Sequence, residues 1–247
     1  FFGMLFQQFY SLMDMIIVGK FLGAKSLAAV GATGSINFMI IGFCMGVCNG
    51  FAIPVAQRFG AKDEKMLRCF VANSVWLSIL FASVMTLSVC LLCRNILVWM
   101  DTPSDIFNEA YRYIFIIFIG IPATYLYNLL SGIIRSLGDS KSPLIFLVIS
   151  SVLNIGLDML AIVVFHMGVA GAAGATVLSQ AISGVLCLFY IKKKFPILRI
   201  QKKEWKLRGN CIGRLCSMGI PMGLQYSITA IGSVILQTAV NGLGSTA

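Results

Sequence analysis

The sequence predicts an all-α integral membrane protein. Hydrophobic residues make up 58% of its 247 residues and charged residues only 11%, with a mean hydropathy of +0.90. A soluble domain carries roughly 25% charged residues, and a membrane-spanning helix needs about 20 predominantly apolar residues. Seven segments of the chain reach that length. Composition and segment length together therefore indicate a polytopic helical fold.

Short connections separate the predicted spans, except for one long basic stretch before the last. The second span is longer than a bilayer requires, so we expect it to tilt or to extend beyond the membrane near Pro54. Pro122 and Pro221 interrupt apolar runs and are candidate kink positions in the fourth and seventh spans. The spans cover residues 1–19, 27–57, 69–93, 107–134, 144–165, 168–191 and 211–240.

Lys and Arg are distributed unevenly between the two sets of connections. Fifteen of the 19 follow the second, fourth and sixth spans, and four occupy the alternate connections. Because cytoplasmic loops carry the excess of Lys and Arg, we expect a cytoplasmic N-terminus and a multi-pass protein of the cell (plasma) membrane. Topology explains the net charge of +10, so no nucleic-acid partner is expected. The basic stretch is also suited to contact anionic lipid.

Two of the nine acidic residues, Asp14 and Asp158, lie inside long apolar segments. An ionised acid in hydrocarbon costs at least several kcal/mol, so it is retained where it faces protein or water and acts there. A rise of about 1.5 Å per residue places Asp14 roughly 9 Å and Asp158 roughly 12 Å below the outer ends of their helices. We therefore expect one shared site that binds and releases a cation, either a proton or sodium.

Polar side chains recur at spacings of three and four on four of the spans, and residues so spaced share one helix face. This pattern predicts a polar interior surrounded by lipid-facing apolar side chains. The alternative is static hydrogen bonding between helices, which we favour for the Ser and Thr residues. The faces comprise Gln7, Tyr10 and Asp14; Thr124, Asn128 and Ser131; Ser151, Asn154 and Asp158; and Thr176, Gln180 and Ser183.

Small residues form a second pattern. Gly42, Gly46 and Gly50 make a double GxxxG in the second span, which permits another helix to approach closely. A similar run opens the sixth span from Gly168. Static close packing and a surface that slides during a conformational change both remain open.

Signatures of enzymes and metal centres are absent from the sequence. It contains no HExxH and no GxSxG motif, and its single histidine, His166, falls in a loop at the membrane edge. Most of the eight cysteines fall within apolar runs, where they act as small hydrophobic residues. We therefore expect neither an enzyme nor a cofactor, and no metal other than a sodium ion at Asp14 and Asp158.

Short motifs occur in a fixed order along nearly the whole chain. The motifs are Asp14-Met-Ile-Ile-Val-Gly19-x3-Gly23, Ala56-Gln57-x2-Gly60-Ala61-x-Asp63, Arg135-x2-Gly138-Asp139-x3-Pro143, Leu153-Asn154-x3-Asp158, Gly168-Val169-Ala170-Gly171 and Gly219-Ile220-Pro221-x-Gly223-Leu224-Gln225. In that order they resemble the N-terminal half of multidrug and toxic compound extrusion (MATE) transporters, and specifically the DinF-type branch, because an acid is retained at position 158.

The resemblance implies twelve helices in two six-helix lobes around a central cavity that opens alternately to each side. Residues 1–191 would form the first lobe, 192–210 a basic cytoplasmic inter-lobe loop, and 211–247 the first helix of a truncated second lobe. The second lobe of the same chain is then a partner. The implied cation-coupling site comprises Tyr10, Asp14, Asn154, Asp158 and Thr176. Candidate cavity-lining residues are Gln7, Asn128, Ser131, Ser151 and Gln180.

We therefore expect a secondary-active antiporter. It would export organic, cationic amphipathic small molecules across the lipid bilayer in exchange for protons or sodium, by alternating access. One alternative is a lipid-linked oligosaccharide flippase of the same superfamily, which the lack of Lys and Arg in mid-helix disfavours. Another is a seven-helix membrane receptor, which the apolar chain ends and the cytoplasmic N-terminus disfavour. Those ends also suggest a fragment of a longer protein.

Overall fold

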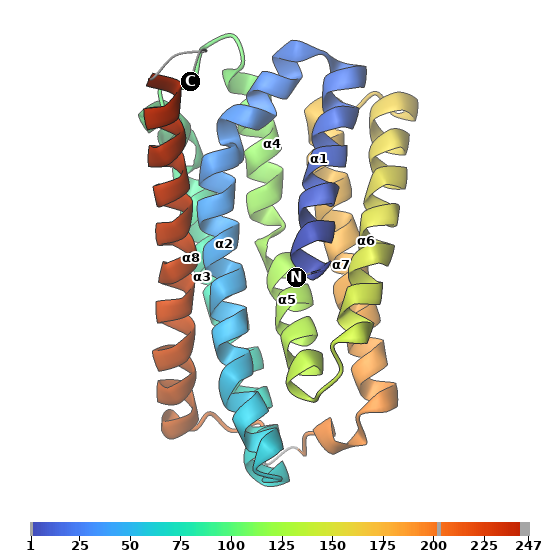
Figure 1. Ribbon diagram of the computed structural model, residues 1–247, viewed down its shortest axis with the longest axis vertical. Coiled ribbons are helices and arrows are strands. Elements are labelled where there is room, and N and C mark those ends of the chain that lie inside the picture. Colours follow the sequence, from blue (N-terminus) through green and yellow to red (C-terminus); the bar gives the residue numbers. More distant parts are fainter. Residues whose placement is uncertain (1, 202–203, 243–247) are drawn as a thin grey trace.

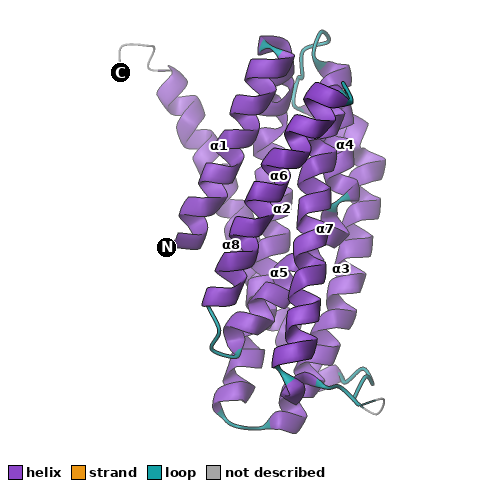
Figure 2. Ribbon diagram, turned by 90° about the vertical axis from the view of Figure 1, so that its right-hand side faces the viewer, coloured by secondary structure: helices purple, strands orange, loops and turns teal. Residues whose placement is uncertain are grey.

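The computed structural model is a bundle of long helices that run side by side (Figure 1). It describes the backbone of residues 2–201 and 204–242 and the side chains of residues 12–201 and 204–232. Within these ranges every regular element is helical, which confirms the predicted fold class (Figure 2). The α-helices are α1 (Phe2–Leu22), α2 (Ala24–Gly60), α3 (Glu64–Trp99), α4 (Phe107–Ile119), α5 (Ile121–Ser136), α6 (Lys141–Met159), α7 (Gly168–Lys194) and α8 (Gly209–Gly242).

The fourth predicted span is broken into two helices. Helices α4 and α5 meet at an angle of 45°, with Pro122 in the first turn of α5, so the predicted kink is confirmed there. Gly120 occupies the break, where an added Cβ would collide with Val177 of α7. Only glycine lets the bent span approach α7 so closely. Pro221, by contrast, lies inside α8, which continues through it as one helix.

The outer surface of the bundle is apolar. Leu91, Phe189 and Val152 are 73%, 66% and 65% exposed. Exposure on this scale marks a lipid-facing surface. In the part of the chain that the structure describes, α2, α3, α7 and Lys141–Val164 are each long and apolar enough to cross a membrane, and the bent pair of α4 and α5 makes a fifth. The fold is therefore membrane-embedded.

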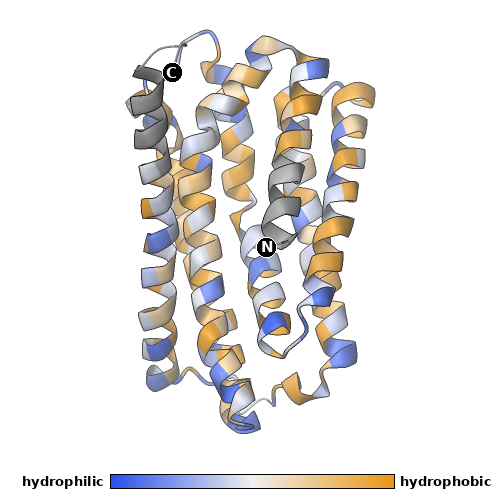
Figure 3. Ribbon diagram, viewed as in Figure 1, coloured by the Kyte–Doolittle hydropathy of each residue, from blue (hydrophilic) through white to orange (hydrophobic). Residues whose placement is uncertain are grey.

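The two ends of the bundle differ in charge. The connections α2–α3, α5–α6 and α7–α8 lie at one end, which we call the basic end; it is at the bottom of Figure 1, and hydrophilic residues gather there (Figure 3). Among the residues with described side chains, every ion pair found also lies there. The pairs are Arg58–Asp63, Arg68–Glu64, Arg68–Glu204 and Lys194–Asp139.

Helix α8 packs closely against α2. A Cβ added at Gly46 would lie 2.5 Å from the carbonyl oxygen of Met222, and one added at Gly50 would lie 2.5 Å from Cα of Gly219. Gly46 and Gly50 of the double GxxxG therefore meet α8 with backbone against backbone, while a Cβ added at Gly42 would lie 3.7 Å from Cβ of Tyr226. Two hydrogen bonds join the helices on either side of the glycines. Ser227 donates to the Met39 carbonyl at 3.2 Å, and Arg214 donates to Gln57 Oε1 at 3.3 Å.

Helix α1 lies beside α6 and α7, in the half of the bundle away from the basic end (Figure 1). It turns into α2 at Gly23, whose φ of +87° is readily adopted only by glycine. Helix α6 changes at its far end into a π-helical turn, Leu160–Val164, which begins two residues after Asp158. Such turns occur frequently at functional sites. The two intramembrane acids therefore come from helices that are neighbours in space.

Candidate functional site

Asp14 of α1 and Asp158 of α6 meet inside the bundle. Their side chains are 7% and 0% exposed, and their carboxyl groups lie within hydrogen-bonding reach of each other. The two residues are 144 positions apart in the sequence. Their similar predicted depth thus corresponds to a direct contact between the two side chains.

The contact has a simple chemical requirement. Ionised carboxylates carry acceptors only, so a hydrogen bond between two of them needs one proton between them. The Oδ1 atoms of Asp14 and Asp158 are also buried without a partner among the described residues. No ion pair found in the described part of the chain includes either acid. The pair therefore offers acceptor oxygens to a proton or a small cation, with no fixed basic group competing for them.

Asn154 links Asp158 to α7. With the amide oriented to satisfy both neighbours, its nitrogen donates to Asp158 Oδ2 at 3.2 Å and its oxygen accepts from the Thr176 N–H at 3.3 Å. In the opposite orientation the amide nitrogen lies 3.4 Å from Thr176 Oγ1. The hydrogen-bond network favours the first orientation, because it satisfies both the amide nitrogen and the amide oxygen. Either way, one fully buried amide joins the acid pair to the hydroxyl-bearing turn of α7.

The other predicted polar residues divide into two groups. Asn128 donates to the Thr124 carbonyl and Ser151 to the Leu147 carbonyl, both within their own helices, and Ser131 lies against Tyr127 one turn away. Each of these polar groups thus has its partner one turn away in its own helix. On α7, Gln180 Oε1 and Ser183 Oγ are buried with no partner among the described residues.

Two of the predicted site residues cannot be placed in this network. Gln7 and Tyr10 belong to α1, but their side chains lie outside the described residues. They lie on the helix that carries Asp14, with Tyr10 one turn and Gln7 two turns before it. Their assignment to the site therefore stays a prediction.

Two polar connections were not predicted from the sequence. Ser150 of α6 donates to the Ser179 carbonyl of α7 at 3.3 Å. Nearer the basic end, Arg135 of α5 donates to Asn49 Oδ1 at 3.2 Å, and the Asn49 amide donates to the Tyr226 hydroxyl of α8 at 3.5 Å. Asn49 directly precedes Gly50 of the double GxxxG, and this position beside a helix-contact motif was the only sequence feature that could have indicated a contact with another helix. Periodicity along one helix does not identify partners on two others.

The donor set around the acids consists of oxygen and amide groups. Where side chains are described, no group of three or more His, Cys, Asp or Glu residues is placed to hold a metal ion. Two carboxyls, an amide and a hydroxyl match the oxygen chemistry that hard cations require. The donor set is therefore chemically suited to a proton or a sodium ion.

Fold and site together define a membrane-embedded helical bundle with a pair of acids shared between α1 and α6. The chain belongs to the MatE family, whose model matches residues 1–160. This match agrees with the resemblance drawn from the sequence motifs.

Individual relatives support the assignment. The chain is 34% identical over 250 residues to the "Probable multidrug resistance protein YpnP" of Bacillus subtilis (strain 168), covering 98% of this chain and 54% of that protein. A MATE family transporter of the MOP superfamily in its outward-facing conformation matches with a TM-score of 0.88 and 26% identity, over 96% of this chain and 52% of the other.

An inward-facing structure of such a transporter matches with a TM-score of 0.84 and 26% identity, over 91% of this chain and 51% of the other. The chain thus spans about half the length of the relatives it matches.

Proposed function

We propose that this chain is the ion-coupling half of a secondary-active antiporter. The transporter exports organic, cationic amphipathic compounds, including xenobiotics, in exchange for protons or sodium. Residues 1–191 act as the first lobe, 192–210 as the inter-lobe loop, and 211–247 as the first helix of the second lobe. Asp14 and Asp158 are the coupling groups, while Tyr10, Asn154 and Thr176 position them or complete the ion site.

The observation that carries this proposal is the contact between two buried acids with unpartnered oxygens. A structural pair would be expected to have each oxygen satisfied or a basic residue beside it. Asp14 and Asp158 have neither among the described residues. A bound cation would provide a partner for these oxygens, and its release would leave them without one again. Binding energy at the pair can therefore favour one arrangement of α1 against α6 over another.

Two observations support alternating access and the substrate class. Related transporters have been solved in outward-facing and inward-facing conformations. Relatives of this chain are named multidrug resistance or multidrug export proteins. In our proposal the contact between α2 and α8 joins the two lobes, and the whole protein changes which side its cavity faces.

The proposed orientation places the basic end in the cytoplasm and the protein in the plasma membrane. Fifteen Lys and Arg residues follow the second, fourth and sixth spans, against four in the alternate connections. Since positively charged connections are retained on the cytoplasmic side, α1 runs outward and Asp14 lies in the outer half of the membrane.

Transport in inside-out vesicles under separate proton and sodium gradients tests the proposal. We expect Asp158→Asn to abolish efflux driven by either gradient while leaving the amount of inserted protein unchanged. The amide keeps the size of the side chain but cannot exchange a proton or carry the charge. Asp105→Asn is the matched control, because Asp105 is exposed at the end away from the basic end and should leave efflux intact.

Full ion-driven efflux by the Asp158→Asn protein would refute the coupling role. Efflux that responds to only one of the two gradients in the unmodified protein identifies the coupling ion. Loss of efflux in the Asp105→Asn control would instead point to a general defect of acidic substitutions.

A further inference from the structure

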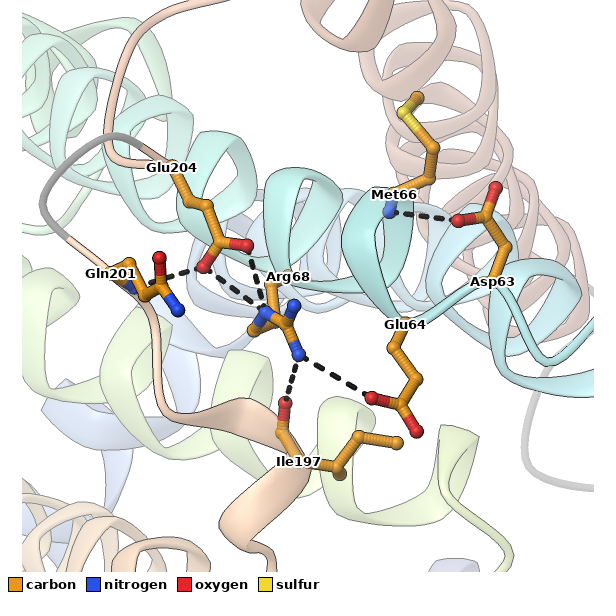
Figure 4. A network of polar contacts seen from close by, with 7 residues as sticks. All are labelled: Asp63, Glu64, Met66, Arg68, Ile197, Gln201 and Glu204. Carbon is orange, nitrogen blue, oxygen red and sulfur yellow. Dashed lines mark hydrogen bonds and ion pairs between the residues drawn. The ribbon is translucent and has the colours of Figure 1, made fainter.

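The stretch between α7 and α8 is folded onto α3. We call residues 195–201 and 204–208 the linker strap; residues 202 and 203, between the two parts, are not described and are not included in it. Arg68 of α3 donates through Nε to both carboxylate oxygens of Glu204, at 2.9 and 3.1 Å, and Glu204 also accepts from the Gln201 N–H at 2.9 Å (Figure 4). A further Arg68 nitrogen reaches the Ile197 carbonyl at 3.5 Å. One guanidinium therefore holds two points of the strap.

Two more residues of α3 extend the attachment along the helix. Asn73 is fully buried; its Oδ1 accepts from the Arg208 N–H at 3.0 Å and its amide nitrogen lies 3.5 Å from the Lys206 carbonyl. Trp76, one turn further, donates through Nε1 to the Trp205 carbonyl at 3.2 Å, and the two indoles pack edge to face with centroids 6.3 Å apart. Both described parts of the strap are thus attached to α3, mainly through backbone groups.

This attachment leaves the charges of the strap unbalanced. Glu204 is the single acid between positions 192 and 214, which hold nine Lys and Arg residues. Burial opposes its ionisation, but the Gln201 N–H, Arg68 and Lys65 hold the pKa of Glu204 below its usual range. Its negative charge is paired with Arg68 of α3 and is not paired with the described basic residues of the strap. The exposed side chains of Arg199, Lys206 and Arg208 face solvent without it.

The strap also carries apolar side chains at the edge of the lipid-facing surface. Trp205 is 40% and Leu207 is 62% exposed. Trp76, Ile79 and Leu80 continue that exposed apolar surface along α3, toward the middle of the bundle. Tryptophan is enriched where hydrocarbon meets lipid headgroups. The indole pair therefore lies at the boundary between an apolar flank and a basic strap.

We propose that the linker strap is a binding surface for anionic phospholipid. Trp205 and Leu207 enter the interfacial layer beside Trp76, and Arg199, Lys206 and Arg208 contact the phosphate-bearing headgroups. Each basic residue near an anionic membrane surface adds to the attraction. Arg68 and Asn73 already bind backbone groups of the described parts of the strap, so lipid binding does not require these contacts to form. This inference does not depend on the coupling role of Asp14 and Asp158.

Fluorescence quenching by brominated lipid tests the proposal in the full chain. A protein with the remaining tryptophans replaced by Phe, including Trp76→Phe and Trp99→Phe, reports from Trp205 alone. It is reconstituted in equimolar phosphatidylglycerol and phosphatidylcholine, with bromine on the acyl chains of one lipid or of the other. Lipid composition is then constant. We expect Trp205 quenching about twofold greater when the phosphatidylglycerol carries the bromine.

The matched control retains Trp99 alone, which is 74% exposed at the opposite end of α3, and should be quenched equally by both lipids. Combined Arg199→Gln, Lys206→Gln and Arg208→Gln substitutions should abolish the headgroup preference at Trp205. Added salt should weaken it in the unsubstituted strap, because exposed charges are screened. Equal quenching of Trp205 by the two lipids, or a preference that survives the three substitutions, would overturn the proposal.

Discussion

The acid pair and the contact between α2 and α8 satisfy opposite packing requirements. At the pair, two carboxyl groups meet in the interior, and each retains an oxygen without a partner among the described residues. At the α2–α8 contact, glycines bring backbones so close that no side chain fits between them, and polar residues on either side are hydrogen-bonded. The acid pair has buried oxygens without a hydrogen-bond partner, and the α2–α8 contact is closely packed.

The acid pair is therefore suited to bind a ligand, whereas the α2–α8 contact is suited to transmit the movement of one helix to the other. Unpaired buried polar atoms are costly, so a protein retains them where a ligand completes them. Closely packed backbone transmits displacement because protein interiors deform little. We infer that an ion bound by α1 and α6 acts on the orientation of whole helices, and that the close contact between α2 and α8 transmits this movement between the two lobes.

The largest effect is expected at the pair. Asp14→Asn should reduce ion-driven efflux to the level of protein-free vesicles, and the Asp14→Asn, Asp158→Asn double variant should be no worse than either single one. Two groups that share one ion lose the same interaction whichever is removed, so their effects do not add. Transport assays of the three variants provide the measurement. Additive, partial losses would show that the acids act independently.

A second large effect is expected at the glycine contact. Gly50→Ala places a methyl group against the backbone of α8 and should destabilise the folded protein by about 1–3 kcal/mol, the usual cost of overpacking. Gly156→Ala is the control, since its Cβ meets open space in a helix and should stabilise by about 0.5–1 kcal/mol. Thermal unfolding in detergent compares the two. Equal effects would contradict a close α2–α8 contact in the membrane.

A smaller effect is expected for the ion pair beneath the strap. Arg68→Gln and Glu204→Gln should each destabilise the protein, with a coupling energy between them of about 1 kcal/mol. That is the scale of a well-oriented charged pair near solvent. A double-mutant cycle of thermal unfolding measures this coupling energy. A value near zero would mean that the strap is held by Asn73 and Trp76 rather than by Arg68.

The smallest effect concerns acid stability at the turn between α5 and α6. Burial opposes the ionisation of Asp139, but hydrogen bonds from Tyr190 and Ser142 and the charge of Lys194 lower its pKa to about 2, from an ordinary value of 3.8. A lowered folded-state pKa stabilises the protein above about pH 4, and this contribution is lost as the pH falls toward about 2. Asp139→Asn should abolish this part of the pH dependence of unfolding.

Comparing Asp139→Asn with Lys194→Gln at neutral pH separates the contributions. Lys194 lies 3.7 Å from the Asp139 carboxylate, whereas the Tyr190 hydroxyl donates to it at 2.6 Å. We therefore expect the lysine substitution to leave most of the acid-sensitive stability in place. An acid-unfolding profile that is unchanged in Asp139→Asn would exclude this contribution.

Several features of the molecule followed from the sequence alone. The helical class, the approximate spans and the asymmetric charge of the two ends depend on composition and local periodicity, which each segment carries by itself. Asp14 and Asp158 were conspicuous because an acid in an apolar span is energetically expensive wherever the helix packs. The placement of Asn154 one turn before Asp158 likewise required only helix geometry.

Tertiary packing decided which of these groups meet. The break at Gly120 depends on Val177 of another helix, the partner of the GxxxG glycines depends on how α8 returns, and Arg68 finds Glu204 across 136 positions. Local propensity does not specify such pairings, because each one is selected by the shape and polarity of a surface elsewhere in the chain. The sequence by itself placed two acids inside a membrane bundle, and only the packing of α1 against α6 made them a pair.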